Sequence, residues 1–219
     1  MKKNRVPFIV IDGQDGSGKG TQIKLLRSRL TQEGKRYGED FIFTREPGGV
    51  LLSEDLRTVI KSDAGMSADT LTQFLMFWAA RNAWHKQCVV PALERGVVVF
   101  SDRGDSSTFA YQIRAGNAPT LANEFWRMRE LVFGDHAPTQ YIIVDVPAEE
   151  ARRRSLSASD GEHATVFDMK EVEFYDNVRS GLLEFAGINS SGRIVDGVGD
   201  PQFIHGEIYA YVSSICGWQ

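Results

Sequence analysis

A glycine-rich run directly follows the apolar stretch 8–11 and is the segment best suited to bind phosphate. The run consists of Gly13, Gln14, Asp15, Gly16, Ser17, Gly18, Lys19, Gly20 and Thr21. Glycine tolerates backbone dihedrals and close approaches that a Cβ would prevent, so successive N–H groups can converge on phosphate oxygens. Lys19 adds a positive charge there, and apolar residues follow at helical spacing from Ile23 to Leu30. The pattern predicts a P-loop between a strand and a helix, holding the phosphates of a nucleotide. The segment 13–21 is called the phosphate loop below.

The residue after the P-loop lysine departs from the usual pattern. That position normally carries Ser or Thr as a magnesium ligand, but here it is Gly20, and the hydroxyl is displaced to Thr21. One residue is about 100° of rotation around a helix, so Thr21 can replace the usual ligand only with a shift of the helix. We still expect Mg²⁺ with the nucleotide, held largely by phosphate oxygens, water and distant carboxylates, with Thr21 and Asp102 as candidate protein ligands.

A second charged and glycine-rich segment, 44–49, follows the apolar run beginning at Phe41. Arg45 offers a planar fork of donors that suits the phosphate of an acceptor substrate. Pro47 constrains the turn, and the glycines after it allow the backbone to approach a ligand. The alternative interpretation is a surface salt bridge between Arg45 and Glu46.

Asp102 and Arg103 follow the apolar run 97–100, so an acid and a base emerge at the end of a buried strand. Asp102 is suited to hold magnesium directly or through water, and Arg103 to bind a phosphate. A salt bridge between these two residues alone is the other interpretation. Thr108 and Tyr111 lie shortly after them in the segment expected to form a wall of the site.

The segment 71–81 has helical spacing and carries an aromatic residue four positions before an arginine. Leu71, Phe74, Leu75 and Trp78 are predicted to form the core-facing stripe, whereas Phe77 and Arg81 share a neighbouring face. Phe77 could stack on a pyrimidine while Arg81 donates to a ring carbonyl. Spacing alone favours core packing and a surface arginine instead.

The order of elements predicts an α/β fold with a parallel sheet covered by helices on both faces. The expected strands are 8–11, 41–44, 97–101, 141–146 and 193–195. The expected helices begin near Lys19, Leu52, Ala68, Leu121, Ala148, Asp168 and Pro201. Ligands of such sheets bind beyond the carboxyl ends of the strands, where the three charged or glycine-rich segments lie.

Composition limits the classes of protein that this chain can belong to. Its 219 residues, 42% of them hydrophobic, suit one domain covering 1–219. A net charge of −4 without a basic stripe favours small nucleotides over nucleic acid as partners. No apolar run approaches the roughly 18 residues of a membrane span, so we expect no membrane association and a soluble, cytoplasmic protein. Cys88 and Cys216 are expected to remain thiols.

The motifs together resemble the thymidylate kinases, especially the bacterial type. The resemblance rests on the segments 12–19, 44–49, 75–81 and 102–112, in matching order and spacing, and extends to about Val146. It implies a P-loop nucleoside-monophosphate kinase with a five-stranded parallel sheet and a lid. The implied reaction transfers the γ-phosphoryl group of ATP to dTMP, with Mg²⁺, giving dTDP and ADP. The family usually forms homodimers.

The same resemblance assigns roles to individual residues. Lys19 and the loop amides would hold ATP, and Arg45 and Arg103 would hold the dTMP phosphate. Asp15 would approach the 3′-hydroxyl of the sugar. For the base and the sugar, the resemblance implies stacking by Phe77, a carbonyl contact by Arg81, a pocket near Pro47, a polar contact by Thr108, and crowding of the sugar 2′ position by Tyr111.

The lid, expected at about 152–170, is where the resemblance is weakest. Members of the family take a catalytic arginine from the phosphate loop or from the lid, and the loop position here is Gly16. Of three consecutive arginines at the start of the lid, Arg153 matches best, with Arg152 and Arg154 as neighbours that could serve instead. The segment 155–165 is polar and is predicted to be a loop, without the further arginines of the bacterial pattern.

Three other functions remain open from the sequence. The first is a kinase for dUMP or a 5-substituted dUMP, which the base pocket would decide. The second is a nucleotide-binding protein that has lost turnover, suggested by Gly20 and the arginine-poor lid. The third is an adenylate kinase, which shares the wording of the segment 18–22 but not that of 75–81.

Overall fold

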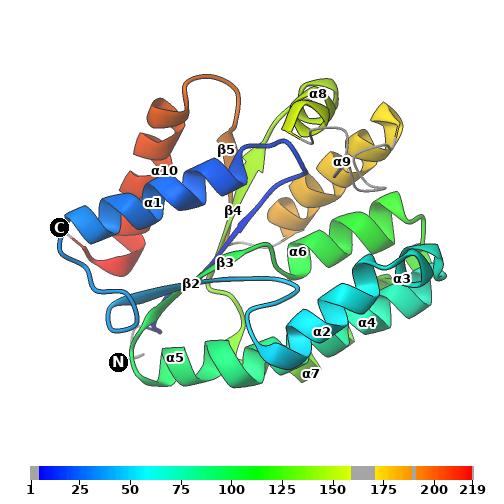
Figure 1. Ribbon diagram of the computed structural model, residues 1–219, viewed down its shortest axis with the longest axis horizontal. Coiled ribbons are helices and arrows are strands. Elements are labelled where there is room, and N and C mark those ends of the chain that lie inside the picture. Colours follow the sequence, from blue (N-terminus) through cyan, green and yellow to red (C-terminus); the bar gives the residue numbers. More distant parts are fainter. Residues whose placement is uncertain (1–4, 159–170, 189–190, 219) are drawn as a thin grey trace.

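Five parallel strands in the order β2-β3-β1-β4-β5 form the centre of the computed structural model, which describes residues 5–158, 171–188 and 191–218 (Figure 1). The strands are β1 (Phe8–Asp12), β2 (Phe41–Arg45), β3 (Val98–Asp102), β4 (Gln140–Asp145) and β5 (Gly192–Asp196). The α-helices are α1 (Lys19–Gln32), α2 (Leu51–Lys61), α3 (Asp63–Ser67), α4 (Thr70–Trp84), α5 (Val90–Glu94), α6 (Asp105–Thr108), α7 (Ala122–Phe133), α8 (Ala148–Ala158), α9 (Val172–Ile188) and α10 (Pro201–Cys216). Wider π-helical turns, η1 (His85–Val89) and η2 (Phe109–Ala115), continue α4 and α6, and short 3-10 turns, η3 (Pro119–Leu121) and η4 (Gly134–His136), flank α7.

Both faces of the sheet are buried, as the continuous apolar strands predict. Successive side chains of a strand point to opposite faces. Phe8 and Val10 therefore pack into a core with residues of α4, α7 and α9, whereas Ile9 and Ile11 pack against residues of α1 and α10. In Figure 1, α1 and α10 lie on one side of the sheet and α4, α5 and α7 on the other. The predicted fold class is confirmed.

The expected elements agree closely with the observed ones. Both ends of every expected strand lie within one residue of a strand end in the structure. Helices begin at or within two residues of six expected starts; the seventh, Asp168, lies outside the described residues, and α9 begins at Val172. Helix α8 extends through the start of the segment that was predicted to be a loop from Ser155. The rest of the predicted lid, 159–170, is not described.

The predicted core stripe of α4 is only half correct. Phe74 and Trp78 are buried, but Leu71 and Leu75 are 50% and 51% exposed. Helical spacing identifies residues that share a face, and two apolar faces meet on this helix. The spacing cannot say which of those faces packs against the sheet.

The carboxyl ends of β1, β2 and β3 bring the charged segments of the sequence together. Asp102 is paired in register with Ile11 on one side and with Arg45 on the other. The phosphate loop, the turn after β2 and the segment after β3 therefore leave the same edge of the sheet.

Two further findings concern expectations from composition. No helix among the described residues is long and apolar enough to cross a membrane. Cys88 and Cys216 are both free thiols, as predicted.

Candidate active site

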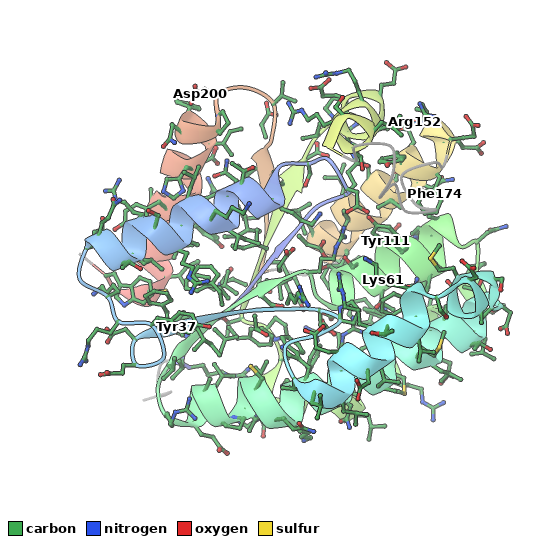
Figure 2. All side chains as sticks on the ribbon, viewed as in Figure 1. Tyr37, Lys61, Tyr111, Arg152, Phe174 and Asp200 are labelled. Carbon is green, nitrogen blue, oxygen red and sulfur yellow. The ribbon has the colours of Figure 1, made fainter. Side chains whose placement is uncertain are left out.

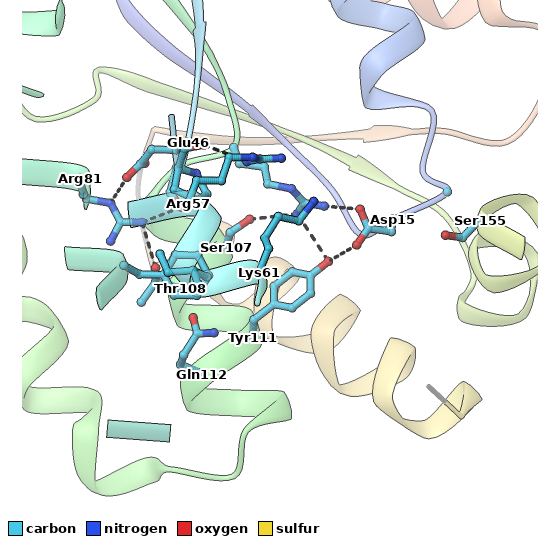
Figure 3. A pocket seen from close by; sticks show the side chains of 16 residues that line it. Asp15, Glu46, Arg57, Lys61, Arg81, Ser107, Thr108, Tyr111, Gln112 and Ser155 are labelled. Carbon is cyan, nitrogen blue, oxygen red and sulfur yellow. Dashed lines mark hydrogen bonds and ion pairs between the residues drawn. The ribbon is translucent and has the colours of Figure 1, made fainter. Parts of the chain in front are cut away.

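A pocket of about 320 Å³ lies at this edge of the sheet (Figure 3). Its walls come from the phosphate loop, the turn after β2, helices α2 and α4, the segment from Arg103 through η2, and Ser155 of α8. Lys61 and Tyr111, far apart in the sequence, both line it and lie near each other in Figure 2. Eight of the residues predicted for the site line this one pocket: Asp15, Gly16, Pro47, Phe77, Arg81, Arg103, Thr108 and Tyr111.

One end of the pocket is a charged network around Asp15. Arg103 donates a hydrogen bond to the Asp15 carboxylate, which also accepts hydrogen bonds from Tyr111 OH at 3.3 Å and Lys19 Nζ at 3.5 Å. Burial acts to raise the pKa of Asp15, but the charges of Arg103 and Lys19 outweigh it and lower that pKa. The network holds Arg103 over the phosphate loop, where its Nη1 also reaches the carbonyl of Gly13 at 3.3 Å.

The backbone of Arg103 explains why its side chain turns back over the loop. Its φ of 69° lies in the left-handed region, which an arginine rarely adopts and which costs about 1 kcal/mol or more. Two hydrogen bonds hold it there: Arg103 N–H donates to Ile11 O at 3.0 Å, and Ser101 Oγ donates to Arg103 O at 2.7 Å. The expected alternative, an Arg103–Asp102 salt bridge, does not form; the carboxylates nearest Arg103 belong to Asp15 and Asp12.

Asp12 fixes the start of the phosphate loop to the segment after β3. Its fully buried carboxylate accepts hydrogen bonds from Ser106 Oγ at 2.5 Å, Ser107 Oγ at 2.9 Å and Gly13 N–H at 2.8 Å. Burial raises the pKa of Asp12, and the hydrogen bonds together with Arg103 oppose that change. Asp12 therefore serves to position neighbouring groups and does not itself line the pocket.

The other end of the pocket contains a buried ion pair. Arg81 Nε lies 2.5 Å from Glu46 Oε1, and the two side chains are only 2% and 3% exposed. Arg81 Nη2 donates to Thr108 Oγ1 at 2.9 Å and to Gly104 O at 3.2 Å. Burial raises the pKa of Glu46 to about 8. The alternative interpretation of an Arg45–Glu46 surface bridge is wrong, because Glu46 turns inward to Arg81 while Arg45 pairs with Glu54.

This inner end is suited to a polar heteroaromatic ring. Glu46 Oε2 and Arg81 Nη1 are buried without hydrogen-bond partners, although both residues line the pocket. Buried polar atoms usually have partners, so a free acceptor and a free donor here indicate a ligand with complementary groups. Phe77, also in the lining, supplies an aromatic surface for stacking.

The phosphate loop has the geometry of an anion cradle. Gly16 and Gly18 have φ of 78° and 88°, and a Cβ added at Gly18 would meet nothing within 4 Å, so space remains beside it. Gly16 is different, because its Cβ would lie 1.9 Å from the carbonyl oxygen of Ala151 in α8. Helix α8 therefore lies directly against the loop, and with α8 in this position no side chain fits at residue 16.

The structure gives a mixed result for magnesium. Among the residues that it describes, no group of three His, Cys, Asp or Glu side chains could hold a metal ion. Asp102 Oδ1 is buried without a hydrogen-bond partner, and the Asp102 charge is close enough to Lys19 to affect its pKa. Thr21 is exposed on α1 and does not line the pocket. These groups fit a metal bound mainly by nucleotide phosphates, with Asp102 as the nearby carboxylate.

Comparison with known proteins agrees with the geometry. The sequence model of the family described as thymidylate kinase matches residues 11–205. A thymidylate kinase of Caulobacter vibrioides is 38% identical over 179 residues, covering 82% of each chain. A thymidylate kinase of Pelobacter propionicus is 34% identical over 211 residues, covering 94% of this chain and 93% of that protein. The chain belongs to the thymidylate kinase family.

A solved structure supports the same assignment. The crystal structure of thymidylate kinase from Ehrlichia chaffeensis matches with a TM-score of 0.73 and 30% identity, covering 94% of this chain and 98% of that one. The sequence resemblance to thymidylate kinases is thereby confirmed, and the alternative functions are not favoured.

Two arginines that the family pattern predicted to act on phosphate lie outside the pocket lining. Arg45 forms a bidentate pair with Glu54, at 2.9 and 3.0 Å. Arg153 is 66% exposed on α8 and pairs with Glu150, which also pairs with Arg154. Their roles in thymidylate kinase chemistry stay predictions.

The sequence analysis missed several residues of the pocket. Glu46 was considered only as a partner of Arg45, and Arg57 and Lys61 were not assigned to the site, although all three line it; Ser107 and Gln112 line it as part of the wall expected after Arg103. Arg57 and Lys61 are four residues apart in the expected helix that follows the 44–49 turn. That spacing, directly after a predicted ligand-binding turn, was the signal that could have found them.

Proposed function

We propose that the protein is a thymidylate kinase that transfers the γ-phosphoryl group of ATP to dTMP, giving dTDP and ADP. The observation that supports this most directly is the continuity of one pocket. One end of the pocket, with Phe77, Arg81 and Thr108, is suited to a base. The other end, with Asp15 and Arg103, lies beside the phosphate loop and is suited to a sugar phosphate.

In this proposal, dTMP lies along the pocket with its base at the inner end. Phe77 stacks on thymine, Arg81 and Thr108 contact its polar edge, and Pro47 borders the ring. Asp15 receives the 3′-hydroxyl, and Tyr111 crowds the 2′ position.

The acceptor phosphate lies between Arg103 and the phosphate loop. Its attacking oxygen is already ionised near neutral pH, so no general base is needed and catalysis comes from positioning and charge neutralisation. A bond forms from that oxygen to the γ-phosphorus while the bond to the β-phosphate oxygen of ADP breaks. Arg45 would join Arg103 after leaving Glu54.

The donor site is the phosphate loop. We propose that Lys19 and the backbone around Gly13, Gly16, Ser17, Gly18, Gly20 and Thr21 hold the ATP phosphates. Asp102 and Thr21 are the proposed protein contacts to Mg²⁺, directly or through water. When bound, Mg²⁺ offsets the negative charge of the transferred group.

The single domain 1–219 includes a lid at about 152–170 in this proposal. Arg153 is the proposed catalytic arginine of the lid, and it would have to leave Glu150 to reach the phosphates. We further propose a cytoplasmic homodimer whose partners are nucleotides and not nucleic acid.

The test of the acceptor site is Arg103→Met. We expect the KM for dTMP to rise at least tenfold, because the phosphate loses a charged donor, while binding of an ATP analogue is retained. Steady-state kinetics and calorimetry measure these two quantities. An unchanged dTMP dependence would remove the proposed role of Arg103.

A further inference from the structure

Helix α2 directs two cations into the pocket. Arg57 and Lys61 are four residues apart on this helix, and both belong to the pocket lining. Arg57 is held in place, since its Nη1 donates to Pro47 O at 2.8 Å. The Lys61 side chain is exposed and forms no hydrogen bond or ion pair with a described residue. Lys61 lines a ligand pocket and is not tied to a carboxylate, so its charge is available to a negative group that a ligand brings.

The charge of Lys61 lies at the phosphate end of the pocket. Burial and Arg57 lower the pKa of Lys61, and the further charges that affect this pKa are those of Asp15, Arg103 and Arg45. The charged pair at the base end, Arg81 and Glu46, is not among the groups that affect this pKa most. Figure 3 likewise shows Lys61 beside the Asp15 and Tyr111 side chains and away from Arg81.

Two other cations near this end are already matched by carboxylates, and Arg57 is bound to the carbonyl of Pro47. Arg103 pairs with Asp15, and Arg45 is held by both oxygens of Glu54. To bind an incoming phosphate, which carries up to two negative charges, these arginines must therefore first break or weaken their ion pairs with carboxylates. Lys61 needs no such exchange, and its flexible stem can carry a compact charge to a phosphate oxygen.

We propose that Lys61 binds the 5′-phosphate of the acceptor nucleotide and thereby favours a nucleoside monophosphate over the nucleoside that lacks it. The inference rests on the proposed function and adds a substrate-binding residue to it. Arg57 supports Lys61 by occupying the carbonyl of Pro47, which leaves the lysine directed at the phosphate.

The test compares dTMP with thymidine in the whole protein. By calorimetry, Lys61→Met should weaken dTMP binding about tenfold, roughly the effect of one lost charged contact to phosphate, and should leave thymidine binding unchanged. In turnover, the KM for dTMP should rise much more than kcat falls. Lys61→Arg, which keeps the charge, should retain most of the dTMP affinity.

Lys86→Met is the matched control, because Lys86 is an exposed lysine of η1 outside the pocket lining. It should bind dTMP as the unaltered protein does. Equal dTMP affinity in Lys61→Met and the unaltered protein would overturn the inference, and so would an equal loss of thymidine affinity. Failure of the unaltered protein to bind dTMP would instead contradict the proposed function.

Discussion

The Arg81–Glu46 pair is the residue-scale feature on which the inner pocket depends. Its two charges are almost completely removed from water, and removing two charges from water costs several kcal/mol that a good ion pair only partly recovers. Both residues of the pair line the pocket, and Glu46 Oε2 and Arg81 Nη1 are buried without hydrogen-bond partners. Recognition of a base explains that retention better than stability does.

Loss of one member of the pair should destabilise the fold. Arg81→Met removes the charge that opposes the raised pKa of Glu46, so the buried carboxyl group is protonated and loses its partner, and we expect the free energy of unfolding in urea to fall by about 1–3 kcal/mol. The double variant Glu46→Leu with Arg81→Met should recover much of that loss, since no carboxyl group without its partner remains buried. Both variants should lose dTMP binding. A double variant that is at least as unstable as Arg81→Met alone would contradict this account.

At the scale of elements, the contact between α8 and the phosphate loop links the helix that leads into the predicted lid to the proposed nucleotide site. The carbonyl of Ala151 lies where a side chain at Gly16 would begin, and Ser155 continues along the pocket wall. Glycine at position 16 therefore permits both the positive φ and the close approach of the helix.

Gly16→Ala should displace α8 from the loop. We expect it to reduce the free energy of unfolding by clearly more than Gly34→Ala and to increase hydrogen exchange in α8. Gly34 is the matched control, because its φ of 80° gives a similar backbone penalty of about 1 kcal/mol while its Cβ would meet nothing within 4 Å. Equal losses in the free energy of unfolding from the two substitutions would mean that the close contact between Gly16 and α8 does not affect stability.

The sequence predicted the helices, the strands and the charged residues at the strand ends well, but it did not predict which charged side chains pair with each other. Buried runs and glycine turns identified the sheet and the phosphate loop because both signals are local. The partner of Glu46 is Arg81 and not the adjacent Arg45, since the direction of a side chain at a strand end depends on the tertiary fold. Lys61 was missed although its spacing from Arg57, after a predicted ligand-binding turn, places both on one helical face; spacing alone does not show what that face meets.

For the molecule as a whole, exposed leucines on α4 are suited to the proposed homodimer. Leu71 and Leu75 lie four residues apart on α4, which packs between α2 and α7. Leu51 at the start of α2 and Leu131 of α7 are exposed as well, at 80% and 76%. Exposed apolar side chains on adjoining helices are suited to burial against another protein surface.

Charges placed on that surface should separate the subunits. We expect the double variant Leu71→Glu with Leu75→Glu to sediment as a folded monomer, because charged groups are costly in the centre of an interface. Phe203→Glu is the control: Phe203 is 80% exposed on α10, which packs on the opposite face of the sheet, and its variant should remain a dimer. Sedimentation velocity reports both masses. The proposal fails if the unaltered protein is monomeric or the double variant stays dimeric.

The most direct test of the central claim is ADP formation from ATP and Mg²⁺ with dTMP, dUMP, 5-hydroxymethyl-dUMP, dCMP, AMP or no acceptor, with the diphosphate product identified. We expect the highest kcat/KM with dTMP, dTDP as its product, and little ADP without an acceptor. Preference for another acceptor, or binding of ATP and dTMP without formation of dTDP, would contradict the account.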